Sequence, residues 1–221
     1  MPLPEEPQFE GQLLEHYDLL DQHLGNFFSP FEIIVFEELQ PIGFQLDVFC
    51  IRPRGASYQV ILTSGMSTAP MKVPPKVSDP LSHRYAELMM VLPADWPLSA
   101  TMPSNMEQDW PVTALKQIAR LPFEQNAFVS WGNTVLHDPY FQPYHESVGF
   151  VGSLLMRSVT RPDVFRRFIS PNGPINILSV FPIYKEELFF IEENGYKEFY
   201  RLLAEKKVVE CLDPNRPNLL V

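Results

Sequence analysis

One loop of the chain holds four side chains that could bind a metal ion or move a proton. The segment "HDPYFQPYHES" carries His137, Asp138, His145 and Glu146. Imidazole and carboxylate groups are ligands that zinc accepts, and a water bound to zinc can hydrolyse a substrate. Loops in which His and Asp stand beside Pro are also common in proteins without a metal site. A metal-dependent or other hydrolase that uses this loop is therefore the alternative hypothesis for the function.

Other catalytic signatures are absent from the sequence. It contains no Gly-x-Ser-x-Gly elbow and no Gly-x-x-x-x-Gly-Lys phosphate loop, and its two cysteines, Cys50 and Cys211, cannot form a Cys-x-x-Cys pair. His16 and His23 lie two turns apart on a predicted helix, about 10.5 Å along its axis, which is too far to share one ion. We expect both histidines at the surface or partly packed. We therefore expect no metal, no cofactor and no enzymatic activity.

The net charge narrows the classes of partner. The chain has 221 residues, with 17 Lys and Arg against 27 Asp and Glu, for a formal charge of −10. Such a surface repels nucleic acid and anionic lipid, and it favours a basic protein partner. The one local cluster of positive charge that stands out contains Arg161, Arg166 and Arg167. No apolar run is long enough to cross a bilayer and the N-terminus does not have the pattern of a signal peptide, so we expect a cytoplasmic protein.

Two helical stretches frame the central part of the chain. Apolar residues at helical spacing predict a helix over residues 7–24, which Gly25 is expected to end. A second helix is predicted over 109–121, with Asp109 as its cap and Pro111 in its first turn. A third helical region follows residue 184 and is interrupted near Gly195.

Between these helices the hydrophobic pattern changes to that of strands. Four runs, at 31–39, 44–51, 58–65 and 85–93, are separated by turn residues without a helix and predict an antiparallel meander. In the second run Phe44, Leu46, Val48 and Cys50 are expected on one side, with Gln45, Asp47, Phe49 and Ile51 on the other. Further strands are predicted at 133–137, 148–159 and 175–184.

Four motifs in order resemble the suppressor-of-fused-like domain family. They are "LTSGMSTAPMKVP" (62–74), "AELMMVLPADWPL" (86–98), "WPVTALKQIARLPFEQNAFVSWGNTV" (110–135) and "SVFPIYKEELFF" (179–190). The resemblance covers about residues 30–195 and implies an α+β fold in which a mostly antiparallel sheet is flanked by helices. We expect one such domain over 1–221, with the N-terminal helix and the C-terminal tail as extensions.

The resemblance also implies what the protein does. Two-domain animal members of the family hold a short peptide of a transcription factor as an added strand, but this chain matches only the first of their domains. Bacterial single-domain members are thought to act as immunity proteins against toxins. We therefore expect a non-enzymatic protein-binding domain that neutralises a basic toxin or binds a peptide segment, with its oligomeric state open.

The family-like motifs supply the candidate partner-binding residues. They lie in the "TSGMS" turn, in the "LPADWPL" corner and at the start of the third helical region. The candidates are Ser64, Gly65, Met66, Asp95, Trp96, Tyr184, Glu186 and Glu187. Each of these segments also has an explanation in folding alone. Gly65 is expected to adopt a positive φ, Asp95 to stabilise a turn, and the acidic residues Glu186 and Glu187 to interact with a helix N-terminus.

Overall fold

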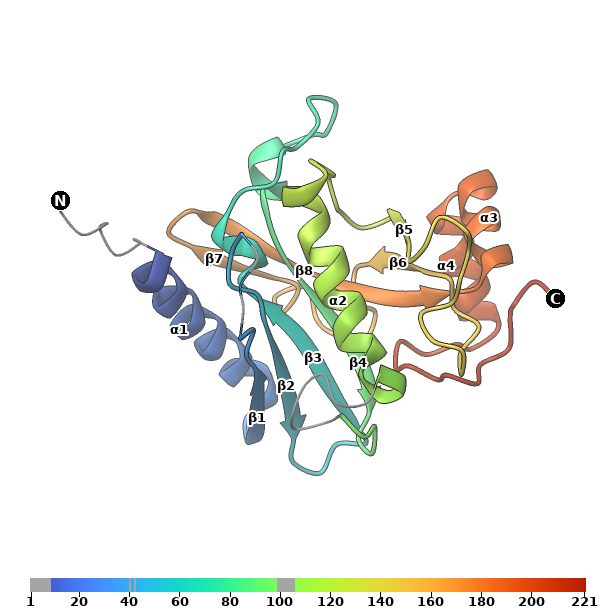
Figure 1. Cartoon of the computed structure of the whole chain (residues 1–221), viewed down its shortest axis with the longest axis horizontal. Coiled ribbons are helices and arrows are strands. Elements are labelled where there is room, and N and C mark those ends of the chain that lie inside the picture. Colours follow the sequence, from blue (N-terminus) through green and yellow to red (C-terminus); the bar gives the residue numbers. More distant parts are fainter. Residues whose placement is uncertain (1–8, 40, 42, 99–105) are drawn as a thin grey trace.

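The chain, here a computed structural model, folds into a sheet covered by helices on both faces (Figure 1). The structure describes residues 9–39, 41, 43–98 and 106–221. The helices are α1 (Phe9–Phe28), η1 (Met66–Thr68), η2 (Pro80–His83), α2 (Met106–Glu124), α3 (Lys185–Asn194) and α4 (Tyr196–Glu205). The strands are β1 (Phe31–Phe36), β2 (Asp47–Pro53), β3 (Tyr58–Ser64), β4 (Tyr85–Pro93), β5 (Thr134–Leu136), β6 (Gly152–Met156), β7 (Arg167–Ser170) and β8 (Gly173–Ile183).

The strands form one sheet in the order β1-β2-β3-β4-β8-β6-β5, with β7 paired to β8 outside this path. The first four strands are antiparallel neighbours, which confirms the predicted meander. β4 and β8 are parallel, because the chain passes through α2 and three shorter strands before it returns beside β4. The predicted α+β fold with a mostly antiparallel sheet and flanking helices is confirmed.

Alternating side chains along the strands build cores on both faces of the sheet. On one face, Val48 and Cys50 of β2 pack with Leu115 of α2. On the other face, Phe49 and Ile51 of β2 pack with α1. The alternation expected in the second predicted strand is therefore present, with both of its faces buried.

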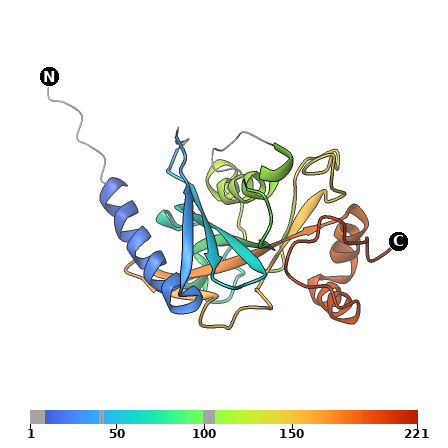
Figure 2. The same cartoon turned by 90° about the horizontal axis from the view of Figure 1, so that it is seen from below.

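The second face carries α3 and α4 as well, at the end of the sheet away from α1. Their apolar residues, such as Leu188 and Phe199, pack with Phe181 and Ile183 of β8 and with Leu154 of β6. Figure 2 shows the separation: α1, in blue, lies at one end of the molecule, and the orange and red helices lie at the other.

Several sequence expectations were wrong in detail. Helix α1 continues through Gly25 to Phe28, because Phe28 packs in the same core as Leu24. The start of the predicted helix at residue 7 lies outside the described residues. Asp109 is the fourth residue of α2 and is buried, so it is not the cap. The short strand β7 was not predicted, since four residues carry too little periodicity.

The histidines of α1 are buried rather than exposed. His16 and His23 retain 6% and 8% of their exposure, because the face of α1 that carries them lies against the sheet. His23 Nε2 lies 2.8 Å from the backbone oxygen of Phe165, and its ring stacks on Phe168.

Among the described helices, none combines the length and the apolar character that a membrane-spanning helix needs.

Candidate functional site: two buried carboxylates and a groove at the sheet edge

A buried carboxylate organises the "TSGMS" turn. Glu87 of β4 is fully buried and accepts hydrogen bonds from Thr63 Oγ1 (2.6 Å), from the backbone N–H of Gly65 (3.2 Å), and from both the N–H (2.9 Å) and the Oγ (2.7 Å) of Ser67. His16 Nε2 lies 3.2 Å from Glu87 Oε1. These contacts join the turn, β4 and α1 at one point. The hydroxyls of Thr63 and Ser67 thus bind a carboxylate that is distant in the sequence.

Gly65 has the positive φ that the turn motif predicted, at 122°. A Cβ atom at this position would lie 2.2 Å from the backbone oxygen of Gln45. Ser64 and Met66, the neighbours of Gly65, are buried. The three candidate residues of this turn therefore present little side-chain surface to a partner, and any role for them in binding stays a prediction.

The "LPADWPL" corner follows the end of β4. Trp96 donates its Nε1–H to the backbone oxygen of Gln108 at 2.9 Å and packs edge-to-face on Trp110. The side-chain amide of Gln59 completes the corner, because its Nε2 donates to the backbone oxygens of Trp96 (2.8 Å) and Pro93 (3.0 Å). Asp95 is exposed at the tip of the turn. The corner thus fixes how the sheet ends and leaves one carboxylate open to solvent.

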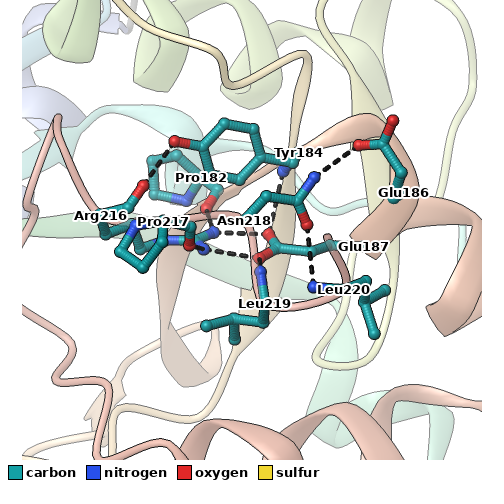
Figure 3. A network of polar contacts seen from close by, with 9 residues as sticks. All are labelled: Pro182, Tyr184, Glu186, Glu187, Arg216, Pro217, Asn218, Leu219 and Leu220. Atoms are coloured by element: carbon teal, nitrogen blue, oxygen red, sulfur yellow. Dashed lines mark hydrogen bonds and ion pairs between the residues drawn. The ribbon is translucent and has the colours of Figure 1, made fainter.

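A second buried carboxylate lies at the end of β8. Glu187 of α3 is fully buried, and its two oxygens accept from the two Nη atoms of Arg216 at 2.6 Å each (Figure 3). It also accepts from the N–H groups of Tyr184 (3.0 Å) and Leu219 (3.2 Å). Burial of a carboxylate is tolerated where a cation and further donors complete its coordination.

The C-terminal tail covers this carboxylate. Tyr184 donates its hydroxyl to the oxygen of Arg216 at 2.6 Å, and Asn218 donates to Glu186 at 2.6 Å (Figure 3). Leu212 donates its N–H to the oxygen of Val91 in β4 at 2.8 Å. The tail is therefore docked against the end of the sheet, and part of it covers the family-like segment 184–187.

The candidate residues do not form one surface. β4 runs from the Glu87 network at its beginning to Asp95 beyond its end, and at about 3.4 Å per residue Glu87 and Pro93 are roughly 20 Å apart. Because β8 is parallel to β4, Tyr184 lies at the same end of the sheet as Asp95. The turn at Gly65 is thus separated from the other two segments. The sequence did not predict Arg216 as the partner of Glu187, because the two residues are 29 positions apart in the chain.

A groove of about 670 Å³ runs between α2 and the edge strand β5. Its lining includes Ile118 and Leu121 from α2, Thr134 and Leu136 from β5, and His137, the residue after β5. The C=O of Asn133 accepts from the N–H of Leu155 in β6, and the N–H of His137 donates to the C=O of Val151, the residue before β6. Since such bonds alternate along an antiparallel strand, the N–H and C=O groups of Thr134 and Leu136 point away from β6. This edge can therefore pair with another strand.

The four residues of the alternative metal site do not converge. His137 and Asp138 line the groove, whereas His145 Nδ1 lies 2.8 Å from Ser147 Oγ and Glu146 is exposed. Among the described residues, no group of three or more His, Cys, Asp or Glu side chains could hold a metal ion. Burial lowers the pKa of His137, and its Nδ1 lies 3.1 Å from Gln117 Oε1. The imidazole is therefore part of the wall of the groove.

The groove carries more free negative than positive charge. Glu124 and Asp138 line it. Arg120 also lines it, but both oxygens of Glu38 accept from Arg120 Nη2, at 2.7 and 2.6 Å. An extended segment with basic side chains would thus meet favourable charges along this edge.

Comparisons with known proteins bear on this architecture. The family model for suppressor of fused protein matches residues 44–217, a range that reaches into the docked tail. A structure described as a suppressor-of-fused homologue from Neisseria gonorrhoeae aligns with a TM-score of 0.70 at 16% identity, over 94% of this chain and 98% of that one. No curated protein sequence matches the chain.

Two further structures share the fold at lower similarity. The structure of a Sufu–Fu complex aligns with a TM-score of 0.58 at 13% identity, over 96% of this chain and 92% of that one. Drosophila Suppressor of Fused aligns with a TM-score of 0.54 at 12% identity, over 93% of this chain and 51% of that one, so the chain spans about half of the Drosophila protein. With its fold and more than half of its length matched, the chain belongs to the suppressor of fused protein family.

Proposed function

We propose that this chain is a non-enzymatic protein-binding domain that takes an extended segment of a partner as an added strand along β5. The observation that carries the proposal is the groove between α2 and β5, next to the outward N–H and C=O groups of Thr134 and Leu136. Strand addition uses such an edge for main-chain hydrogen bonds and an adjacent groove for side chains. Leu136 is 39% exposed and offers apolar contact at the same place.

The other edge of the sheet is the natural comparison. β1 is the opposite edge strand, and Val35 is 40% exposed there. The N–H of Arg54 bonds to the oxygen of Pro30, so the alternation directs the N–H of Val35 outward as well. β1 and β5 could each accept a strand, and the large groove with its polar and apolar walls favours β5.

The partner class follows from charge. With a net charge of −10 and with Glu124 and Asp138 at the groove, a basic segment is favoured in both encounter rate and docking. A basic toxin neutralised by this domain is the partner we propose, and a regulatory peptide bound in the same way is the variant of that proposal.

Selection from a random peptide library, followed by hydrogen exchange, tests the proposal. We expect the selected peptides to be rich in Lys and Arg and to slow amide exchange at Thr134 and Leu136. Protection confined to β1, or to the exposed corner at Asp95, would contradict the assignment of the edge. Selection of acidic peptides only would contradict the partner class.

The hydrolase alternative is separated from this proposal by two measurements. Stoichiometric zinc in the purified protein, together with turnover that is lost in His137→Ala and His145→Ala, would favour the hydrolase. Zinc below stoichiometry and peptide binding that survives a chelator are what we expect. Co-expression with toxin genes from the same genomic neighbourhood then tests the immunity role, and rescue of growth is the expected result.

A further inference from the structure

A polar pocket of about 410 Å³ lies at the start of β4 and β8, away from the groove along β5. Five separate segments of the chain line it: the η2 region, the turn before β5, the residue after β6, the loop into β7 with the first residue of β7, and β8. Its polar and aromatic walls include Ser82, His83, Trp131, Arg157, Arg166 and Arg167. None of these residues lines the groove along β5, so the pocket is a distinct site.

Positive charge is concentrated in this pocket. Three arginines line it against two aspartates, although the chain as a whole carries a charge of −10. Asp163 is paired with Arg166, and Asp79 accepts from the hydroxyl of Ser82. Within the described part of the chain, no ion pair involves Arg157 or Arg167. Their charges are therefore available to an anion.

The guanidinium groups are held in place by neighbours that leave donors free. Arg157 lies 4.0 Å above the ring of Trp131, and Arg167 donates one Nη to the oxygen of Ser82 at 3.0 Å. Asn176, which is 8% exposed, donates to the same oxygen at 2.7 Å and fixes it. Each guanidinium has five N–H donors, so most remain unused.

One donor of Arg166, a residue that lines the pocket, is buried and has no described partner. The Nε of Arg166 is shielded from solvent, and no described atom accepts a hydrogen bond from it. Buried N–H groups have an acceptor in the great majority of native structures, and this donor lacks one among the described residues. Burial, followed by the charge of Arg167, lowers the pKa of His83 in the same wall, which is consistent with a positive local field.

We propose that this pocket binds the phosphate group of a small phosphorylated ligand. Guanidinium forks match phosphate oxygens in pairs, which a single lysine cannot do. The volume suits a small molecule, and the rings of His83 and Trp131, with centroids 4.8 Å apart, offer an aromatic wall for the group that carries the phosphate. The acidic remainder of the surface disfavours a nucleic acid as the source of that phosphate.

Titration with inorganic phosphate and with phenyl phosphate, followed by the indole N–H signal of Trp131 in NMR spectra, tests this proposal. We expect saturable shifts with both ions, absent with sodium chloride at equal ionic strength. Arg157→Gln and Arg167→Gln should each weaken binding at least tenfold, and Arg157→Lys should weaken it less. Arg201→Gln is the matched control, because Arg201 is an exposed arginine on α4 outside the pocket, and its affinity should equal that of the unmodified protein.

The results of these titrations either support or overturn the proposed phosphate site. Equal shifts with chloride, or full affinity in Arg157→Gln, would overturn the site. Binding of inorganic phosphate without phenyl phosphate would overturn the phosphorylated small molecule as its ligand. Arg167 also holds Ser82, so if Arg167→Gln fails to fold, Arg157→Gln carries the test, since the side chain of Arg157 is exposed.

Discussion

Arg216 and Glu187 form a bidentate ion pair in the interior, with both Nη–Oε distances at 2.6 Å. They come from the C-terminal tail and from the first turn of α3, and both are almost fully buried. The guanidinium also lies about 5.0 Å from the ring of Tyr184. This pair therefore attaches the tail to the end of the sheet and closes the surface that the family-like segment 184–187 would otherwise present (Figure 3).

Removal of the arginine from this pair is expected to destabilise the fold strongly. Arg216→Ala leaves the Glu187 carboxylate buried without its cation, which typically costs about 3–5 kcal/mol. Chemical denaturation measures the free energy of unfolding. The matched control is Arg201→Ala, whose pairs with Glu198 and Glu205 are exposed, and a loss below about 1 kcal/mol is expected there. Similar losses in the two variants would show that the tail is not held by the buried pair.

Gly65 and Gly25 are expected to respond to alanine with opposite signs. At Gly65 the φ of 122° and the oxygen 2.2 Å from a new Cβ predict a loss of more than about 2 kcal/mol. At Gly25, inside α1 and with no atom near, alanine should stabilise by about 0.5–1 kcal/mol. Thermal unfolding of both variants measures the difference. A tolerated alanine at Gly65 would contradict the close approach of the Gln45 backbone.

The Glu87 network predicts a large effect of an isosteric change. Glu87→Gln replaces two acceptor oxygens by one acceptor and one donor, so a bond from Ser67, Gly65 or Thr63 must be lost. We expect a loss of about 1–3 kcal/mol in the free energy of unfolding. Glu32→Gln on the exposed side of β1 is the control and should change it by less than about 0.5 kcal/mol. Equal stability of both variants would argue against the network.

Stability should fall on mild acidification because of His23. Burial lowers the pKa of His23 below its ordinary value of 6.5, so the unfolded chain binds the proton more tightly than the folded one. Above about pH 6.5 the imidazole is neutral in both states and does not lower stability. As the pH falls below that value, protonation favours the unfolded chain, so the free energy of unfolding decreases. We expect His23→Phe, which keeps an aromatic ring beside Phe168, to reduce this slope between pH 7.5 and 5. An unchanged slope would show that His23 does not titrate in this range.

Proline substitutions in β5 and in β1 distinguish which of these two strands docks the partner. Leu136→Pro removes an outward N–H from β5, and Val35→Pro removes one from β1, without loss of a ladder hydrogen bond in either case. If a partner strand adds to β5, peptide affinity should fall at least tenfold in Leu136→Pro and stay within twofold in Val35→Pro. The reverse result would move the docking site to β1. Circular dichroism of both variants checks that the fold is retained.

The local patterns were predictable because they depend on neighbours in the sequence. Period-two alternation placed Val48 and Cys50 opposite Phe49, and the meander of four strands followed from the turns between them. The positive φ of Gly65 followed from its place in a turn motif. The parallel pairing of β4 with β8 was not predictable in this way, because it joins segments with α2 and several strands between them.

The sequence by itself determined the longer helices and most of the strands, the acidic character and the family motifs, because periodicity, composition and residue order are local properties of the chain. Only the tertiary structure decided which carboxylates are buried and which side chains meet them: His16 lies beside Glu87, and Arg216 pairs with Glu187. It also decided that Arg157 joins Arg166 and Arg167 in one pocket, and that β5 becomes an edge with a groove. The physical reason is that burial and charge pairing depend on distances between residues far apart in sequence, which the order of residues does not contain.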